Sequence, residues 1–533
     1  MQADKTDTPD SKAGWLSYIP YLWKPQVFRM IFLGFSAGLP LFLIFSSLSL
    51  WLREAGIDRS AVTYFSWAAL GYSFKFLWAP LVGRMPLPLL TEIFGQRRSW
   101  LLLSQCAIIL SIVMMAMTDP VSSQHALTIM AIAAVALGFS SATQDVVIDA
   151  YRIESAENKY QALMSSMYIT GYRFGMLASG AGALYLASYF GSSSDVYSYQ
   201  AWQSTYLLMA LCMGIGVATT LLIPEPDNSK ANASEHTFHY REHLTLLATF
   251  LLAVIGIIGC YVITSEPAES TKALLQQLSH NQALSSTLTE ATRLGIALSL
   301  AYLIAKSLTS AGFVNKHLVD DFYVTPVKDF FARYSTKQVI LLLSLISLYR
   351  ISDIVLGVIS NVFYQDIGFS KAEIATVVKT FGLIMSLLGG LLGGLMAIRM
   401  GVITTLFLGA LLSAITNLLF VLLASTAPTI EMLYIVIAAD NLAAGVATAA
   451  FVAFLSSLVN LSFTAMQYAI FSSVMTLFPK LLGGYSGTIV DSIGYAPFFV
   501  MTFVLGLPVL VIIMALSLDK SFKTERNQHP ENQ

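Results

Sequence analysis

The sequence predicts an all-α membrane protein in which two bundles of six helices flank a pair of inserted helices. Its 533 residues are 56% hydrophobic and only 11% charged, and the mean hydropathy is +0.68. Such values lie outside the usual range of soluble domains. The same fold class is supported by fourteen apolar runs, each about as long as the roughly 20 residues that a spanning helix needs. It is also supported by an uneven distribution of Lys and Arg.

The first six apolar runs predict the N-terminal bundle. Most connections between them are short, so consecutive helices are expected to be antiparallel. The runs cover residues 28–52, 62–84, 100–118, 126–151, 162–190 and 201–223.

Six further runs predict a second bundle, related to the first by pseudo-two-fold symmetry. They cover residues 338–364, 371–398, 400–424, 430–459, 464–490 and 495–518. The charged segment between the bundles holds two more runs, at 244–264 and 292–314, which we expect to pack peripherally as a hairpin. In the loop between these two, Leu274, Leu275 and Leu278 have helical spacing and indicate a short interfacial helix.

The distribution of basic residues predicts the topology. Fourteen spans, an even number, place both ends of the chain on one side. Basic residues accumulate in short cytoplasmic loops, and with both tails inside, the cytoplasmic side holds nineteen of the thirty Lys and Arg, against at most five outside. The first 27 residues lack the apolar core and cleavage site of a secretory signal. We therefore expect a cytoplasmic tail at 1–27, a bundle at 28–223, a linker with the two extra helices at 224–337, a bundle at 338–518 and a cytoplasmic tail at 519–533.

Composition and missing motifs exclude several classes of function. A net charge of −1 gives no global attraction to nucleic acid. Cys106, Cys212 and Cys260 lie in apolar runs, at spacings that fit neither a zinc site nor a disulfide framework. The sequence has no Walker, HExxH or GxSxG motif and no His cluster. We therefore expect no enzyme, no ATP-driven pump, no cofactor and no bound metal.

A weak repeat relates the two halves. APLVGR at residues 79–84 and GLMAIRMG at 394–401 both resemble the loop signature of the major facilitator superfamily, G-x-x-x-D-R-x-G-R-R. In that signature glycines permit close helix approach and the Arg interacts with helix ends, which implies gating or structural roles for Arg84 and Arg399. Gly83 and Ile398 replace the Asp, and FGQRR at 94–98 supplies the displaced basic end. The departure puts in question any gating salt bridge from that Asp.

Charged residues inside apolar runs are costly and mark functional sites by default. On the fourth helix, Asp145 and Asp149 are four apart and share a face, with Gln144 beside them. Gln144 and Asp145 lie a turn deeper and favour a function. Asp149 and Arg152 either belong to the site or cap the cytoplasmic helix end and bind loop cations.

Two other helices of the first half carry intramembrane cations. Tyr172 and Arg173 on the fifth helix lie among small residues, which allow tight helix packing. Arg173 either neutralises an Asp of the fourth helix or binds an anionic part of a substrate. Lys75 on the second helix, one turn before Trp78, either contacts substrate or extends to the membrane interface.

The second half has its own polar positions. Arg350 and Asp353 on the seventh helix continue at helical spacing into Gly357 and Asn361, a stripe that indicates a wet surface. The alternative is a local Arg350–Asp353 pair buried for packing. Further polar side chains are Lys379 on the eighth helix and Asp440 and Asn441 on the tenth.

Segments along both halves, in order, resemble the AmpG family, the muropeptide permeases of Gram-negative bacteria and a branch of the major facilitator superfamily. The resemblance covers neither the first 27 residues nor most of 224–337. The segments are FKFLWAP (74–80), FGQRRSWLL (94–102), SATQDVVIDAYR (141–152), GYRFGMLASG (171–180), LYRISD (348–353), VVKTFGL (377–383), DNLAAGVATAAFVAFLSSL (440–458) and TAMQYAIFSS (464–473).

The resemblance implies import of N-acetylglucosaminyl-1,6-anhydro-N-acetylmuramyl peptides across the bacterial inner membrane, driven by the proton gradient. The cargo then enters peptidoglycan recycling and, in some species, sets β-lactamase induction. The expected partners are this substrate, protons and membrane lipids, and we expect a monomer.

The cargo fits the polar residues of the sequence. Its carboxylates suit Lys75, Arg173, Arg350 and Lys379, and its sugars suit Gln144, Asn441 and Gln467, with Tyr172 as a further binding residue. Proton coupling needs a carboxylate whose pKa differs between two states, and the candidates in order are Asp145, Asp353 and Asp440. Arg84, Asp149, Arg152 and Arg399 are assigned to gating or structure.

Two alternatives stay open. One is an AmpG-like permease for another cargo, such as a siderophore or an acyl-CoA, which gene neighbourhood would separate from a muropeptide permease. The other is a non-transporting membrane sensor or scaffold. The intramembrane charges argue against a scaffold, because it has no reason to bear their insertion cost.

Overall fold

The computed structural model describes residues 20–44, 46–57, 70–123, 125–155, 158–192, 197–226, 240–279, 282–369, 373–483 and 486–519. Most of both predicted tails, and residues 62–69 of the second predicted helix, lie outside these ranges. The chain divides into two compact units: Met1–Lys230 with Phe331–Gln533, and Ala231–Phe330.

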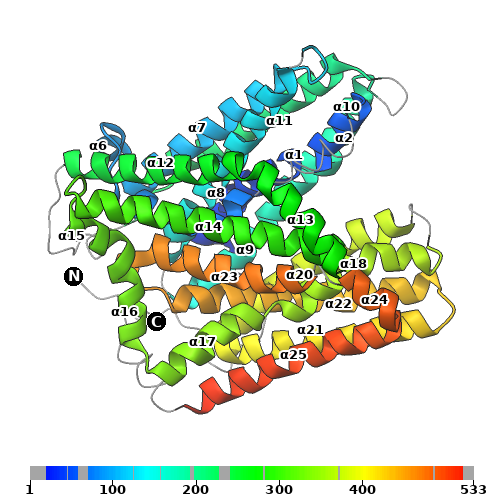
Figure 1. Ribbon diagram of the computed structural model, residues 1–533. Helices are drawn as coiled ribbons and strands as arrows, with labels where there is room; N and C mark the ends of the chain where they lie inside the picture. Colours follow the sequence, from blue (N-terminus) through cyan, green and yellow to red (C-terminus); the bar gives the residue numbers. More distant parts are fainter. Residues whose placement is uncertain are drawn as a thin grey trace. The chain divides into compact units, whose positions relative to one another are not determined.

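The N-terminal part of the first unit is a helical bundle (Figure 1). Trp51, Trp202 and Tyr206 belong to its core, and the stacked rings of Trp51 and Trp202 have centroids 5.7 Å apart. The helices are α1 (Pro25–Ile44), α2 (Ser46–Glu54), α4 (Leu70–Phe74), η3 (Lys75–Leu77), α5 (Ala79–Arg84), α6 (Leu90–Phe94), α7 (Gln96–Ala116), α8 (Ala126–Glu154), α9 (Asn158–Leu177), η4 (Ala178–Gly182), α10 (Ala183–Tyr189) and α11 (Tyr199–Leu222).

The C-terminal part of the same unit is a second bundle. Phe363, Phe420 and Phe499 pack together in its core. Its helices are α17 (Thr336–Leu348), α18 (Ile351–Asp366), η6 (Ile374–Phe381), α20 (Gly382–Met400), α21 (Val402–Ser425), α22 (Ile430–Ser457), η7 (Leu461–Phe463), α23 (Thr464–Gly483), α24 (Ser486–Ile493) and α25 (Tyr495–Leu518).

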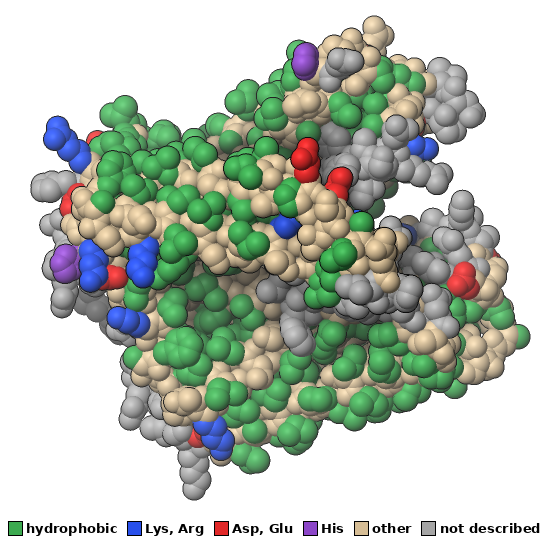
Figure 2. All heavy atoms as spheres, in the orientation of Figure 1, with side chains coloured by type: hydrophobic (Ala, Val, Ile, Leu, Met, Phe, Trp, Pro, Cys, Tyr) green, Lys and Arg blue, Asp and Glu red, His purple; other side chains and the backbone are tan. Residues whose placement is uncertain are grey.

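Exposed apolar side chains run along α25, where Figure 2 shows hydrophobic atoms over the visible face of the helix. An exposed apolar stripe of this length suits a lipid environment rather than water. The exposed residues are Val500, Val504, Leu507, Val511, Met514 and Leu518.

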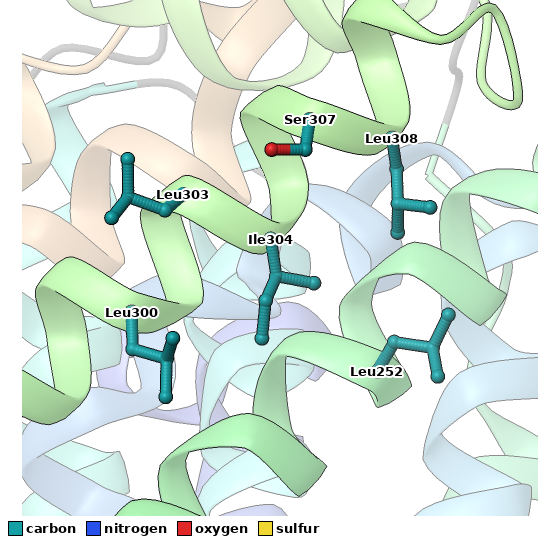
Figure 3. Close-up of a pocket in the computed structure, with 6 residues that line it drawn as sticks. All are labelled: Leu252, Leu300, Leu303, Ile304, Ser307 and Leu308. Carbon is teal, nitrogen blue, oxygen red and sulfur yellow. The ribbon is translucent and has the colours of Figure 1, made fainter.

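The second unit is built on an antiparallel pair, α12 (Tyr240–Ile263) and α14 (Gln282–Ser310). The loop in which leucine spacing predicts a helix contains α13 (Ser265–Ser279), and α15 (Lys316–Val319), η5 (Asp320–Val324) and α16 (Thr325–Arg333) follow α14. Figure 3 shows an apolar pocket between α12 and α14, to which Leu252 contributes from α12. Its other lining residues come from α14: Leu300, Leu303, Ile304, Ser307 and Leu308.

The described residues form helices and no strand, which confirms the all-α prediction. Ten of the helices are long and apolar enough to cross a membrane, so the count of fourteen is not confirmed. The predicted runs at 62–84, 162–190, 292–314 and 464–490 are not among the ten. Helix irregularities interrupt 62–84 and 162–190, and α14 carries polar residues over its first turns.

Helices α1 and α9 pack backbone to backbone because glycines lie at their contact. A Cβ atom added to Gly34 would lie 2.1 Å from the carbonyl oxygen of Tyr168, and one added to Gly171 would lie 1.9 Å from that of Ile31. Interiors this dense do not admit an added methyl group without a shift of the backbone. The packing therefore fixes the position of α9 against α1 at Tyr168 and at the residues one turn beyond it.

The second bundle uses the same device between α20 and α22. A Cβ atom on Gly389 would lie 2.2 Å from the Leu442 carbonyl oxygen, and one on Gly445 2.4 Å from that of Ser386. Each bundle thus contains one helix pair whose spacing is set by its glycines.

We predict that Gly171→Ala destabilises the protein by about 1–3 kcal/mol, the usual cost of overpacking. The matched control is Gly214→Ala on α11, where an added Cβ meets nothing within 4 Å. Alanine is the better helix former, so the control should melt at the same temperature or higher. Thermal unfolding in detergent tests this, and equal melting temperatures for the two variants would contradict the packing argument.

Candidate functional site

Three intramembrane cations lie where a helix loses its regular geometry. Lys75 begins the 3-10 turn η3, Lys379 lies in the π-helical segment η6, and Arg350 lies in the break between α17 and α18. The break at Lys75 has a local cause, since Pro80 in the first turn of α5 cannot donate a backbone hydrogen bond to the preceding turn. Irregular turns inside helices often mark functional segments.

Asp149 lies between two cations of the first bundle. Lys75 Nζ is 3.7 Å from one carboxylate oxygen of Asp149, and a terminal nitrogen of Arg152 is 3.6 Å from the other. Lys75 is buried and pairs with an acid, so it does not extend to the membrane interface. Asp149 is therefore compensated inside the bundle.

Arg152 is fully buried and connects three helices. Its guanidinium donates hydrogen bonds of 3.1 Å to Gln161 and Ser165 and of 2.9 Å to Ser456 in the other bundle. These partners are inside the protein, so Arg152 is an internal connection between the bundles rather than a cap that binds loop ions.

Asp145 and Gln144 lie a turn deeper on α8. The Tyr168 hydroxyl donates to Asp145 over 3.4 Å, and Tyr72 and Tyr172 interact electrostatically with the same carboxylate. Gln144 is fully buried, and neither polar atom of its amide has a hydrogen-bond partner among the described residues. This part of α8 thus presents one carboxylate and one unused amide within a group of tyrosines.

Arg173 is half-buried and forms no ion pair with a carboxylate among the described residues. The structure therefore does not contain the predicted alternative of a pair with an Asp of α8. Its guanidinium instead interacts electrostatically with that of Arg350 in the other bundle. Two like charges so placed in a low-dielectric region repel each other unless an anion lies near both.

The second bundle holds Arg350 between an acid and a hydroxyl. Arg350 Nε is 3.3 Å from Asp353, and its terminal nitrogen donates to Thr448 Oγ1 over 2.7 Å. The predicted local pair with Asp353 is present, but Arg350 keeps 24% of its side chain exposed and is not sealed in the core. Asp440 lies 3.5 Å from Thr416 Oγ1.

The remaining predicted binding residues are spread more widely. The Asn441 amide donates to the carbonyl of Ile437 on its own helix, and Lys379 is exposed on η6. Gln467 is buried, and its side-chain oxygen accepts hydrogen bonds from the Asn460 backbone and from Arg333. The side-chain oxygen of Gln467 is therefore engaged by Asn460 and Arg333, and its contact with cargo stays a prediction.

A network that the sequence did not predict joins the two bundles at one end. Arg97 makes a two-pronged ion pair with Glu154, at 2.7 and 2.8 Å, and both residues bond to Thr464 of the second bundle. Arg97 also donates to the Gly83 carbonyl over 3.1 Å, so a backbone oxygen accepts the hydrogen bond at the position where the superfamily signature has Asp. The basic segment FGQRR was the only signal for this network.

Glu225, in the loop after α11, caps the start of α7. Its carboxylate accepts from the backbone N–H groups of Arg97 and Arg98, at 2.7 and 3.1 Å. A carboxylate at a helix N-terminus is stabilised by the unsatisfied N–H groups there. Burial nevertheless raises the pKa of Glu225 above the usual value of a glutamate.

The signature arginines occupy unequal positions. Arg84 donates to the carbonyl of Ser462 over 3.1 Å and lies over the ring of Phe463, 4.7 Å from its centre, so it contacts the other bundle. Arg399 is exposed in the last turn of α20.

Both ends of the described chain lie at this same end of the first unit, which we call the closed end. Lys24, just before α1, donates to the Tyr160 hydroxyl at the start of α9 over 2.7 Å. Asp519, just after α25, lies 3.5 Å from Gln338 at the start of α17. The closed end therefore carries the start of α1 and the end of α25 together with the contacts between the bundles.

Nothing in the described part of the chain resembles a transition-metal or redox site. No group of three or more His, Cys, Asp and Glu residues is placed to hold a metal ion there.

Comparisons of the sequence with known proteins agree along nearly the whole chain. The family model of the Major Facilitator Superfamily matches residues 30–319 and 341–533. "Putative transporter AmpG 4" of Rickettsia felis is 31% identical over 492 residues, which are 92% of this chain and 96% of the relative. "Anhydromuropeptide permease" of Escherichia coli K12 is 27% identical over 498 residues, which are 93% of this chain and 81% of the relative.

Solved structures share the fold. The proton:xylose symporter XylE bound to 6-bromo-6-deoxy-D-glucose has a TM-score of 0.56 at 13% identity, covering 94% of this chain and 96% of that chain. The transporter FucP in the outward conformation has a TM-score of 0.57 at 10% identity, covering 94% and 99%.

The closed end supports a cross-linking prediction. A Cβ atom on Gly83 would lie 2.9 Å from the Ala465 Cβ, so Gly83→Cys with Ala465→Cys should form a disulfide under mild oxidation. The background would lack Cys106, Cys212 and Cys260, and an engineered protease site between the bundles would reveal the cross-link on a gel.

Adding Glu154→Gln should slow this cross-link, because Arg97 loses its charged partner and the bundles separate more often at this end. The reduced protein serves as the control. Cross-linking at the parent rate in the Glu154→Gln background would show that the ion pair does not hold the bundles together.

Proposed function

The chain belongs to the AmpG-like branch of the major facilitator superfamily, a family of transporters rather than enzymes, and on this premise we propose that it imports anhydromuropeptides into the cytoplasm. The relative named as an anhydromuropeptide permease aligns with 93% of the chain. The import is a proton symport by alternating access across the bacterial inner membrane. The protein acts as a monomer, and its cargo enters peptidoglycan recycling.

The observation that carries this proposal is the pair of guanidinium groups from opposite bundles. Arg173 has no carboxylate partner among the described residues and interacts with Arg350, which is partly exposed. We propose that a carboxylate of the cargo binds to both, since arginine binds carboxylates through two parallel hydrogen bonds. An anion bound there contacts both bundles at once and links substrate binding to their relative movement.

The uncharged part of the cargo can bind polar groups on α8 and α9. The Gln144 amide is buried without partners, and hydroxyls of Tyr168 and Tyr172 lie close to Asp145. A free amide with hydroxyl groups nearby suits sugars, whose hydroxyls both donate and accept hydrogen bonds. Asn441 and Lys379 remain binding candidates, whereas we assign Gln467 to holding the helix end at Asn460.

The proton is carried by a carboxylate whose pKa differs between two arrangements of the bundles. Asp145 is the first candidate, because a tyrosine hydroxyl is its hydrogen-bond partner and no cation lies within ion-pair distance among the described residues. Asp353 has Arg350 at 3.3 Å, so substrate binding to Arg350 changes its charge environment. Asp440 faces Thr416.

The contacts at the closed end support a direction of transport. With nineteen basic residues on the cytoplasmic side, both termini are cytoplasmic, and the contacts made by Arg97, Arg84 and Arg152 then close the cytoplasmic side. The conformation described is one in which substrate enters from the periplasm. Arg399, exposed in the last turn of α20, joins these contacts in the gating set.

Uptake of a radiolabelled anhydromuropeptide tests the function. Cells that lack their own permease and express this protein should accumulate the label, and a protonophore should abolish accumulation. Asp145→Asn should lose accumulation but keep exchange of cargo across the membrane, because the neutral side chain cannot cycle a proton. Correctly inserted protein that takes up no muropeptide would refute the proposal and direct the search to siderophores and acyl-CoA.

The arginine pair yields a second prediction. Arg173→Gln and Arg350→Gln should each raise the KM for uptake by about 10- to 100-fold, the effect of losing a charge-assisted hydrogen bond of about 1.5–3 kcal/mol. The KM of Arg350→Lys should lie between those of the parent and Arg350→Gln, because lysine keeps the positive charge but cannot form two parallel hydrogen bonds to a carboxylate.

A modified cargo makes this test specific. A muropeptide with amidated carboxylates should bind the parent protein poorly and should lose no further affinity in the Arg173→Gln variant. Lys306→Gln, in the second unit, is the control and should leave KM unchanged. Independent, additive losses from the amidated cargo and the variant would disprove the contact.

A further inference from the structure

One face of α22 holds the break between α17 and α18, which consists of Tyr349 and Arg350. The ring of Tyr349 stacks on that of Phe451, with centres 4.2 Å apart, and its hydroxyl lies 3.4 Å from the carbonyl oxygen of Ala447. Arg350 donates to Thr448 Oγ1 over 2.7 Å. Two consecutive residues of the break are therefore fixed by neighbouring residues of α22.

The Thr448 hydroxyl is an oriented acceptor for Arg350. A threonine hydroxyl has one proton and two lone pairs. The proton of Thr448 goes to the carbonyl oxygen of Ala444, one turn earlier on α22, over 2.7 Å. Because a β-branched side chain on a helix also has few rotamers, the lone pair that faces Arg350 keeps its direction.

Two nitrogen atoms of the Arg350 guanidinium are held by the protein. Nη1 donates to Thr448, and Nε lies 3.3 Å from the carboxylate of Asp353, which in turn accepts a hydrogen bond from Ser413 on α21. Nη2 has no hydrogen-bond partner among the described residues, and 24% of the side chain is exposed. A guanidinium is planar and rigid, so two fixed nitrogen atoms also fix the direction of the third.

Arg173 has no comparable support. Its guanidinium makes no hydrogen bond to a described residue and interacts electrostatically with Arg350. Like charges repel, so the side chain of Arg350 would turn away from Arg173 if nothing held it. The hydrogen bond to Thr448 and the ion pair with Asp353 oppose that movement. One arginine of the pair is therefore fixed and the other is free to move.

We propose that Thr448 is a positioning residue for Arg350, which it holds with Nη2 open to a carboxylate. The proposal rests on the proposed function for the identity of this anion, a carboxylate of the cargo. A donor that is already oriented costs less conformational entropy on binding. Thr448 therefore acts on the affinity for the cargo, whereas the maximal rate of transport does not depend on it.

Uptake kinetics of the labelled muropeptide test this role. Thr448→Val has nearly the same shape but no acceptor, and it should raise KM by about 2- to 10-fold, the effect of one hydrogen bond. The maximal rate per inserted protein should stay that of the parent. Thr448→Ser keeps the hydroxyl and should restore KM. The matched control is Thr205→Val on α11, whose hydroxyl bonds to the Ala201 carbonyl of its own helix.

Double variants separate positioning from a general disturbance of the bundle. Thr448→Val should raise KM no further in an Arg350→Met background, because the acceptor has already lost its donor. In an Arg173→Gln background it should raise KM by the same factor as in the parent, because Arg173 does not contact Thr448. A general disturbance would act equally in both backgrounds.

Chemical labelling of arginine tests the contact without cargo. Phenylglyoxal attaches to the two terminal nitrogen atoms of a guanidinium, and the bond to Thr448 engages one of them in Arg350. In purified full-length protein, Thr448→Val should label Arg350 about twofold faster or more, as located by mass spectrometry of peptides. Thr448→Ser should label like the parent, and the rate at Arg173 should not change.

The outcomes distinguish this role from the proposed function. An unchanged KM and an unchanged labelling rate in Thr448→Val, or no restoration by Thr448→Ser, overturn the role of Thr448 and leave muropeptide import standing. Faster labelling of Arg350 in a protein that imports no muropeptide does the reverse, and the anion is then a different carboxylate. Thr448→Ala removes the same acceptor and decides where Thr448→Val does not insert.

Discussion

The structure depends on how charge is compensated inside an apolar layer. A lone charged side chain in hydrocarbon costs several kcal/mol, so each intramembrane ion must find a partner, water or a ligand. Asp149 has two cations, at 3.7 and 3.6 Å, and Arg350 has Asp353. Arg173, Asp145 and Asp440 have no such partner among the described residues, and to these positions we assign the cargo carboxylate and the candidates for the proton.

The contacts that cross the boundary between the two bundles are hydrogen bonds from arginines to uncharged acceptors. Arg97, Arg84 and Arg152 reach across it and bind uncharged or backbone acceptors of the second bundle. Such contacts are individually modest and break without leaving a buried ion pair split between the halves. An interface of this kind opens and closes at low cost, whereas the glycine contacts of α1 with α9 and of α20 with α22 keep each bundle rigid.

The sequence predicted contacts between residues that are close together along the chain. The local pair of Arg350 with Asp353, one of the two alternatives for that stripe, is present between residues three apart. The glycines around Arg173 predicted close helix packing, and Gly171 does contact the backbone of α1. Helix boundaries came within a few residues for most of the apolar runs, because the length of an apolar run is set by the membrane.

Long-range partners were beyond the sequence. Arg97 and Glu154 are 57 residues apart, and no local pattern relates them. Gln467 is predicted as a sugar ligand because amides suit sugars, and no sequence pattern indicated that its oxygen accepts a hydrogen bond from the Asn460 backbone. The count of fourteen spans is not confirmed among the described residues, and hydropathy does not register the irregular turns at Lys75 and in η4. The local sequence pattern predicts where helices lie and which residues adjoin on one helix. Which polar groups remain without a partner is decided by tertiary packing.

The hydrogen bond from Arg97 to the Gly83 carbonyl makes the closed end unusual in its tolerance to mutation. A contact between two side chains is lost when either one is replaced, but a main-chain oxygen is present whatever residue stands at position 83. Substitutions there act through bulk, since a Cβ would press on Ala465, and leave the acceptor in place. A directed-evolution experiment that seeks faster or slower gating would therefore gain more from varying position 97 and its acid, Glu154, than from restoring the acidic residue of the superfamily signature.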